Sequence, residues 1–180
     1  MSLEELIKGC TNNDTKAQEQ LYRLFSSKLF AVCLKYSRNY AEAQDNLQDG
    51  FLIIFDKIGQ YNFKGSFEGW IKRIMVNNVL QQYRGISFLE LINENIPDEP
   101  DVTDDENVPL DYLLKIIQEL PDRYRLVFNL YVIDGYAHKD IAEMLSITTG
   151  TSKSNLARAR IILREKLEGY TGLKNLPSAR

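Results

Sequence analysis

The chain has 180 residues, 44% of them hydrophobic, which excludes a disordered protein and indicates one sizeable domain or two small ones. Its formal net charge of −3 excludes a generic polycation, so any contact with nucleic acid has to come from local positive charge. Two cysteines without a CxxC pair and a single histidine match no zinc-site spacing, so neither a metal nor a cofactor is predicted. Without a recognisable signal peptide or an apolar run of membrane-spanning length, we expect a cytoplasmic protein with reduced thiols and no membrane insertion.

Residues 1–85 are predicted to form a domain of four amphipathic helices. Apolar residues at helical spacing place the helices at about 3–9, 15–36, 40–58 and 67–84. The inward faces are expected to include Leu24, Phe51 and Trp70 among others. The third helix carries polar residues on its other face, namely Asp45, Gln48 and Asp49. The loop between the third and fourth helices, residues 60–66, is rich in aromatic residues for an exposed segment.

Residues 86–109 are predicted to be a linker. From Ile86 to Asp111 there is no Lys or Arg, while acidic residues accumulate and prolines interrupt the chain. Such a segment repels itself and stays extended over its central part. A plain solvated tether and a functional role both remain open for it.

Residues 110–180 are predicted to form a second, smaller helical domain. One helix ends near Leu120, and a second is expected from Asp122 to Ile133 with Tyr131 among its inward residues. A short helix over 137–145, a turn and a second helix over 151–166 then follow. The fold class predicted for the whole chain is therefore all-α, with two small helical domains joined by an acidic linker.

The last two of these helices fit a helix-turn-helix, in which the second helix lies in the DNA major groove. The inward residues of that second helix recur at steps of four, three and four: Ser152, Leu156, Ala159 and Leu163. Its outward residues are short hydrogen-bonding side chains and an arginine, with cations at the margins: Thr151, Ser154, Asn155, Arg158, Lys153 and Arg160. Thr148 is expected to be the N-cap of this helix and His138 to be a solvated residue. An ordinary helical hairpin with a solvated basic face would give the same periodicity, but these side chains suit base edges and phosphates.

Several segments in order resemble bacterial RNA polymerase sigma factors of the extracytoplasmic-function (ECF) group. Residues 45–51 (DNLQDGF) are similar to the family's core-polymerase-binding segment, and 67–77 (FEGWIKRIMVN) to its promoter-melting segment. Residues 120–128 (LPDRYRLVF) look like the opening of sigma region four. Residues 135–145 and 150–160 look like its helix-turn-helix, although Ser146 stands where the family's turn usually has Gly and is expected to need a positive φ.

The resemblance implies a role for each segment. Residues 1–85 would be sigma region 2, residues 86–109 the linker and residues 110–180 sigma region 4. Contacts with the minus-ten promoter element would come from Asn62, Phe63, Lys64, Ser66, Phe67, Trp70, Arg73, Asn77 and Arg84. Contacts with the minus-thirty-five element would come from Thr151, Lys153, Ser154, Asn155, Arg158 and Arg160. The contacts with core polymerase would come from Asp45, Gln48, Asp49 and Phe51.

The partners implied are bacterial core RNA polymerase, promoter DNA and an anti-sigma factor, and the chain would direct promoter-specific initiation of transcription. The main alternative is a helix-turn-helix regulator whose N-terminal domain dimerises or senses a signal, which leaves the basic aromatic stretch 61–84 unexplained. An enzyme is not predicted, because no nucleophile–base set, phosphate loop or metal-ligand spacing is present.

Overall fold

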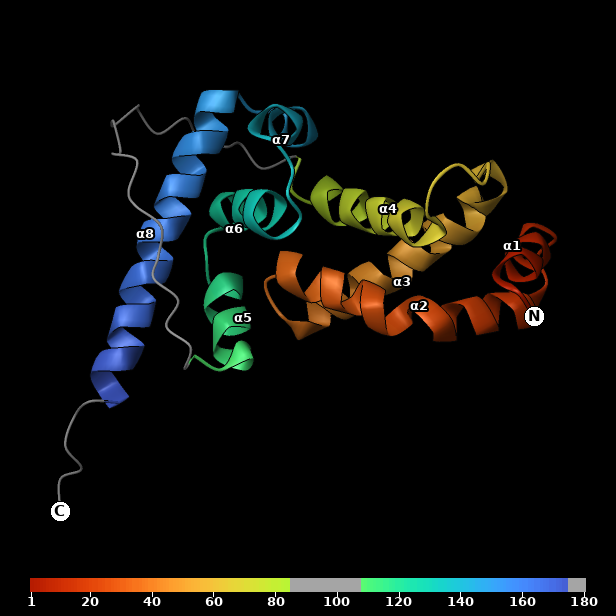
Figure 1. The fold of residues 1–180 in the computed structure, drawn as a ribbon, viewed down its shortest axis with the longest axis horizontal. Coiled ribbons are helices and arrows are strands. Elements are labelled where there is room, and N and C mark those ends of the chain that lie inside the picture. Colours follow the sequence, from red (N-terminus) through yellow and green to blue (C-terminus); the bar gives the residue numbers. More distant parts are fainter. Residues whose placement is uncertain (85–107, 175–180) are drawn as a thin grey trace, which may run out of the picture. The chain divides into compact units, whose positions relative to one another are not determined.

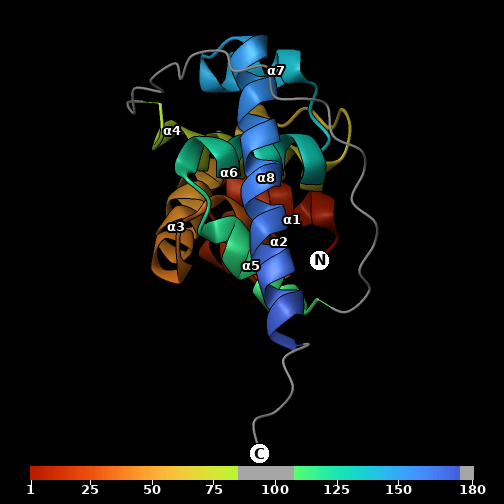
Figure 2. The same cartoon turned by 90° about the vertical axis from the view of Figure 1, so that its left-hand side faces the viewer.

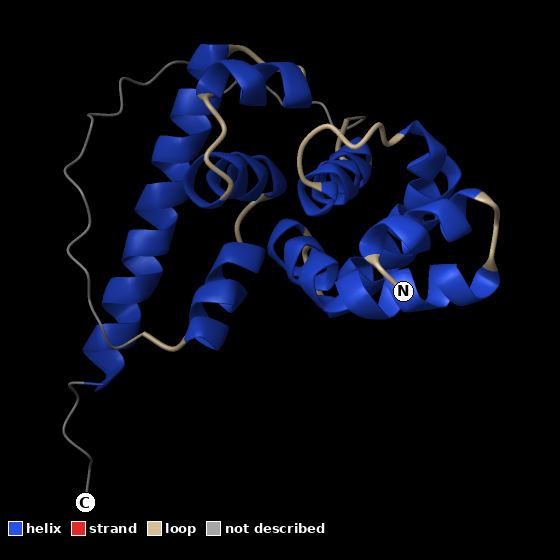
Figure 3. Ribbon diagram, turned by 45° about the vertical axis from the view of Figure 1, so that its right-hand side comes forward, coloured by secondary structure: helices blue, strands red, loops and turns tan. Residues whose placement is uncertain are grey.

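The fold was analysed in a computed structural model that describes residues 1–84 and 108–174. Within these residues every regular element is a helix (Figure 3), which confirms the predicted all-α class. The chain divides into two compact units, Met1–Gly85 and Ile86–Arg180. The predicted acidic linker, 86–109, lies outside the described residues except for its last two positions.

Helix α2 is the centre of the N-terminal unit (Figure 1), because it packs against α1, α3 and α4. The elements of this unit are α1 (Leu3–Thr11), α2 (Thr15–Tyr36), α3 (Tyr40–Lys57), the 3-10 turn η1 (Ile58–Gln60) and α4 (Phe67–Gln81). Asp14 caps α2, since its side chain accepts a hydrogen bond from the Lys16 N–H at 2.9 Å.

Two predictions about this unit are wrong. Leu24 is 54% exposed, because it lies about 100° around α2 from the centre of the buried stripe that contains Phe25 and Leu29. Helix α4 ends at Gln81 instead of Arg84. Beyond Gln81 the backbone N–H groups donate to carbonyls three residues back, and Tyr83 turns inward, where its hydroxyl donates to Glu42 at 3.0 Å.

The long helix α8 organises the C-terminal unit, and α5, α6 and α7 all pack against it (Figures 1 and 2). The elements are α5 (Leu110–Gln118), α6 (Asp122–Phe128), the π-helical turn η2 (Asn129–Ile133), α7 (His138–Leu145) and α8 (Thr149–Lys174). One core cluster joins α5, α6 and α8 through buried side chains, namely Ile116, Leu120, Tyr124, Ala159 and Leu163.

The structure also corrects two helix bounds and one inward residue in this unit. Tyr131, which was expected to face inward, is 36% exposed. The single helix predicted over 122–133 changes to π-helical hydrogen bonding at Asn129, where the Asp134 N–H donates to the Asn129 carbonyl at 3.0 Å. Helix α8 continues to Lys174 instead of 166. Its extension is supported by α5, because the Tyr112 ring stacks on Tyr170 with centroids 4.3 Å apart and the Tyr112 hydroxyl donates to the Lys166 carbonyl at 3.0 Å.

Arg125 is a buried cation that ties α5 to α6. Its side chain is 1% exposed, and Nη2 lies 2.6 Å from the Asp122 carboxylate. Nη1 donates to the carbonyls of Leu120 at 2.9 Å and Gln118 at 3.3 Å. Carbonyls at a helix end lack partners within the helix, so one guanidinium satisfies both the end of α5 and the carboxylate that begins α6.

Helices α3 and α4 approach closely at Gly50. A Cβ atom at this position would overlap Sδ of Met75, which is completely buried. A side chain fits here only if the Met75 side chain moves within the core, so the close crossing of the two helices favours glycine.

We therefore expect Gly50→Ala to lower the free energy of unfolding of the N-terminal unit by about 1–3 kcal/mol through overpacking. Urea unfolding followed by fluorescence of Trp70, the only tryptophan of the chain, reports on this unit specifically. Gly69→Ala is the matched control, because the nearest atom to a Cβ there is 3.8 Å away. Equal stability changes in the two variants would contradict the close crossing.

Candidate nucleic-acid and polymerase interfaces

The loop between η1 and α4, residues 61–66, is held by its own hydrogen bonds. The Tyr61 hydroxyl donates to the Gly65 carbonyl at 2.7 Å, and Ser66 caps α4 by accepting from the Gly69 N–H at 3.3 Å. Phe63 and Gly65 have positive φ values of 60° and 81°. Glycine adopts this conformation readily, whereas a bulky residue such as phenylalanine rarely does so outside functional sites. The loop therefore presents Phe63 in an unusual backbone conformation.

Four aromatic rings of the loop and α4 pack together. The Tyr61 ring centroid is 5.1 Å from Phe63, 5.1 Å from Phe67 and 5.5 Å from Trp70. Phe67 also contacts Phe25 of α2, with ring centroids 5.7 Å apart. Tyr61 and Phe67 are buried at 9% and 4% exposure, Trp70 is half-buried and Phe63 is 50% exposed. Phe67 was expected to contact bases, but it is buried and instead packs beneath the more exposed rings of Phe63 and Trp70, on the side of the core.

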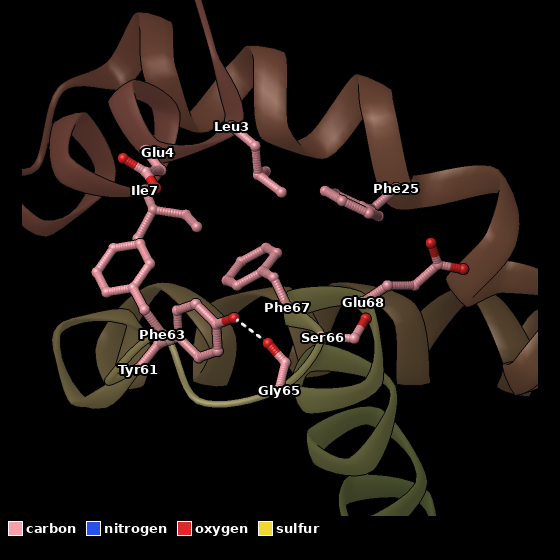
Figure 4. A pocket seen from close by; sticks show the side chains of 10 residues that line it. All are labelled: Leu3, Glu4, Ile7, Phe25, Tyr61, Phe63, Gly65, Ser66, Phe67 and Glu68. Carbon is pink, nitrogen blue, oxygen red and sulfur yellow. Dashed lines mark hydrogen bonds between the residues drawn. The ribbon is translucent and has the colours of Figure 1, made fainter.

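A pocket of about 480 Å³ opens beside this loop (Figure 4). Its lining comes from α1, α2, the loop and the start of α4, and includes Leu3, Glu4, Ile7, Phe25, Tyr61, Phe63, Gly65, Ser66, Phe67 and Glu68. Aromatic and aliphatic side chains form most of the walls, and two carboxylates add hydrogen-bond acceptors. Its volume lies within the range typical of small-molecule sites.

Polar and basic side chains surround the exposed aromatic surface. In the loop, Asn62, Lys64 and Ser66 are exposed, and the Lys64 N–H donates to Asn62 Oδ1 at 3.1 Å. On α4, Arg73 is exposed, whereas Lys72 and Asn77 are half-buried. Arg84 is exposed in the turn after α4. The structure therefore brings the loop residues of the predicted minus-ten set together, and α4 carries the remaining polar members apart from Arg84.

On α3, the polar residues predicted to bind polymerase are exposed, but the apolar residue predicted with them, Phe51, is not. Asp45, Gln48 and Asp49 are exposed as expected. Phe51 is 3% exposed and packs on Tyr22 of α2 with ring centroids 4.6 Å apart, so it is not available to a partner. Leu52 is instead 68% exposed.

Leu52 belongs to the polar face of α3 by position. It follows Gln48 by four residues and Asp49 by three, which places these side chains on one face of a helix. The sequence contains the signal for this assignment, because Phe51 falls in the row of the buried residues Leu47 and Ile54 whereas Leu52 does not. Leu52 is the apolar side chain that sequence reasoning missed.

Helices α7 and α8 form the predicted helix-turn-helix. Ser146 ends α7 in the left-handed region with φ 55°. The turn therefore has the positive φ that was expected at this position, although serine, unlike the family's usual glycine, carries a side chain. Thr148 caps α8 as predicted, since its Oγ1 accepts from the Thr151 N–H at 3.0 Å. The start of α8 is therefore fixed by a cap and by a defined turn, as a DNA-recognition helix requires.

Most of the residues that were expected to face DNA lie on the accessible side of α8. Lys153 and Arg160 are exposed, and Thr151, Ser154 and Arg158 are half-buried. Ser154 Oγ donates to the Thr151 carbonyl at 3.0 Å, which leaves its lone pairs available as acceptors.

Asn155 is the exception and lies inside the unit. It is 5% exposed, and its Nδ2 donor is buried without a hydrogen-bond partner among the described residues. Its position explains this, because Asn155 follows the buried Ser152 by three residues and precedes the buried Ala159 by four. Asn155 therefore belongs to the inward stripe of α8 in spite of its polarity.

In the described ranges 1–84 and 108–174, no three His, Cys, Asp or Glu side chains are grouped as metal ligands. The helices of the same ranges include none long and apolar enough to cross a membrane.

Cys10 and Cys33 are both buried free thiols. Burial raises the pKa of Cys33 to about 12, so this thiol stays protonated and serves as a packing group.

Comparisons with known proteins match both units of the chain to one family. Residues 21–87 match the family model of Sigma-70 region 2, and residues 110–163 match that of Sigma-70, region 4. The chain is 27% identical over 183 residues to the ECF RNA polymerase sigma factor SigW of Bacillus subtilis, covering 93% of this chain and 97% of SigW. It is 29% identical over 167 residues to the ECF RNA polymerase sigma factor SigM of Mycobacterium tuberculosis, covering 92% and 84% of the two chains.

A solved structure shares the fold. It is the sigma factor RpoE of Bartonella quintana in complex with the anti-sigma factor NepR, with a TM-score of 0.54 and 22% identity over 83% of this chain and 96% of that chain. The two family models together match more than half of the chain, in the order in which sigma factors carry these regions. The chain therefore belongs to the sigma-70 family of RNA polymerase sigma factors, within the ECF group.

Proposed function

We propose that this sigma factor binds bacterial core RNA polymerase and directs it to promoters that its two helical units contact at two separate elements. The observation that carries this proposal is the presence, in one chain, of a region 2 match with an exposed aromatic loop and a region 4 match with a helix-turn-helix. The alternative, a helix-turn-helix regulator with an N-terminal dimerisation or sensor domain, leaves the region 2 match unexplained. Sigma factors select promoters and are not themselves enzymes, and we place this one in the cytoplasm with the polymerase.

The loop 61–66 and α4 would contact the minus-ten element. Separating a base from its stack costs a few kcal/mol, so the protein has to offer a replacement surface. Phe63 and the accessible part of Trp70 supply aromatic surface, and the adjacent pocket can enclose an unpaired base. Asn62, Ser66 and Asn77 would add hydrogen bonds, and the nearby cations would neutralise phosphates, namely Lys64, Arg73 and Arg84. Phe67 keeps these rings in place from the core.

The outer face of α8 would contact the minus-thirty-five element. Lys153 and Arg160 are exposed cations suited to phosphates, whereas Thr151, Ser154 and Arg158 have the groups that read base edges in the major groove. Asn155 is not part of this surface because it is buried. Its side chain packs inside the unit and does not reach the DNA.

The polar face of α3 would dock on core polymerase. A stable protein interface needs an apolar anchor surrounded by polar groups. Leu52 has the exposure that such an anchor needs, and Asp45, Gln48 and Asp49 supply the polar surroundings. An anti-sigma factor is a further proposed partner, since the sigma factor of the matched structure is bound to one.

Reconstitution with bacterial core polymerase tests the proposal directly. We expect the chain alone to bind duplex promoter DNA weakly, and the holoenzyme to start transcription at specific sites, because promoter opening needs both units on one polymerase. Sequencing the 5′ ends of run-off transcripts measures this specificity. A stable homodimer that binds palindromic DNA tightly and is indifferent to polymerase would support the regulator instead.

Leu52→Ala should weaken binding to core polymerase about fivefold or more, since an anchor residue contributes more than about 1 kcal/mol. Titration of labelled core polymerase measures this affinity. Leu24→Ala is the matched control, because Leu24 is a leucine of similar exposure on α2 and outside the proposed face. If both variants bind like the parent chain, α3 does not use Leu52 as its anchor.

Arg158→Ala should cost about 1–3 kcal/mol of promoter binding and relax base preference in the minus-thirty-five element if Arg158 reads a base. Lys153→Ala should weaken binding evenly across sequences and lower the salt slope by about one, as expected for a phosphate contact. Binding of the holoenzyme to promoter variants at several salt concentrations distinguishes the two. Lys115→Ala, which removes an exposed cation on α5, is the control and should leave both measures unchanged.

A further inference from the structure

His138 is packed between elements and is not the solvated residue that its sequence position predicts. Its Nδ1 lies 2.8 Å from Oγ of Ser152, and its ring stacks on Tyr131 with centroids 4.4 Å apart and an interplanar angle of 18°. Tyr131 belongs to η2 and Ser152 to α8, so the only histidine of the chain connects three elements.

The contact with Ser152 acts on the start of the recognition helix. Ser152 is completely buried on the inward face of α8, where an aliphatic residue would normally pack. A buried hydroxyl without a partner costs free energy, and His138 supplies that partner. Because Ser152 directly precedes Lys153, the imidazole positions the end of α8 that is proposed to enter the major groove.

The charges around His138 come from the proposed DNA-binding face. Helix α7 packs against η2 and α8. The ring of Tyr131 is the titratable group that η2 places against the imidazole, and α8 contributes Lys153 and Arg160. The sequence neighbours of His138 on its own helix are also charged, namely Lys139 and Asp140. Burial, and then Lys153 and Arg160, hold the pKa of His138 below its usual range.

We propose that His138 is a positioning residue for α8 and that it takes up a proton from solvent when α8 binds promoter DNA. The proposal rests on the proposed function of α8. Phosphates that meet Lys153 and Arg160 would neutralise the two cations that disfavour a charged imidazole, and would add negative charge nearby. The bond to Ser152 survives protonation, because a neutral Nδ1 can accept from the hydroxyl and a protonated Nδ1 can donate to its lone pair.

The sign of the pH dependence follows from this linkage. DNA binding raises the pKa of His138 from its lowered value in the free chain, so the complex holds more protons than the free partners in the window between the two values. Within that window promoter affinity increases as the pH falls, by up to about tenfold per pH unit for one proton. Above both values the affinity is independent of this residue's titration.

NMR titration of the full chain tests the proton uptake directly, because a single histidine gives a single imidazole signal to assign. The probe is a duplex with the upstream element of a promoter that the reconstituted holoenzyme uses. We expect the pKa of His138 to rise when this duplex is added. A duplex that shifts the amide signals of α8 and leaves the pKa unchanged would overturn the inference. Because the chain alone is expected to bind duplex DNA weakly, the duplex is added in excess at NMR concentrations, and the absence of any shift of the α8 signals under these conditions would contradict the proposed role of α8.

Variants test both parts of the inference in the holoenzyme. His138→Gln does not titrate and should flatten the dependence of promoter affinity on pH within the window between the two pKa values of His138. Lys115→Gln is the matched control, because it removes one exposed charge on α5, outside the charged groups named around His138, and should keep the parent slope. An unaltered slope in His138→Gln would overturn the proton linkage.

Ser152→Ala and His138→Phe each remove the hydrogen bond between these two residues. His138→Phe retains an aromatic ring that can stack on Tyr131. Each should reduce promoter affinity by about five- to tenfold, and the double variant should be no weaker than either single one. Additive losses would show that the two residues act independently and would overturn the positioning role.

Discussion

Each of the two helices proposed to contact DNA, α4 and α8, buries one face in the core of its unit, so only the opposite face is available for contact with DNA. In α8 the buried stripe holds Leu156, Ala159 and Leu163, and in α4 the corresponding stripe holds Ile71, Met75 and Val79 among others. DNA can contact only the side chains that lie outside these buried stripes. The packing that stabilises each unit therefore also fixes the direction in which its contact residues point.

The sequence predicts the elements well and the exact borders of their faces less well. The all-α class, the helix-turn-helix and the cap at Thr148 follow from local rules, because capping and helical periodicity depend on a few neighbouring residues. The left-handed Ser146 follows from the resemblance to the family, whose turn usually has glycine there. Asn155 shows the limit. Polarity predicts an outward residue, whereas its position one turn from Ser152 and Ala159 places it in the buried stripe.

Contacts between residues of different elements could not be predicted, because helical periodicity relates only residues within one helix. His138 meets Ser152, fourteen positions later, and Tyr131, seven positions earlier, only because the turns on both sides of α7 fold back. The pocket beside Phe63 needs α1 and α2 to close it. Leu52 was predictable in principle, since its exposure follows from the same periodicity that buries Phe51. The segment that resembles the family, 45–51, ends one residue before it.

The hydrogen bond from Tyr61 to the Gly65 carbonyl would affect the kinetics of promoter opening if the loop contacts the minus-ten element as proposed. It closes the segment 61–66 upon itself, and ordering a free chain costs about 1–2 kcal/mol per residue. That cost is met when the protein folds, before any strand separates. In the proposed contact with the minus-ten element, a base that leaves its stack would then meet a surface that is already ordered. The rate of its capture would reflect how often the duplex opens and not how quickly the protein rearranges.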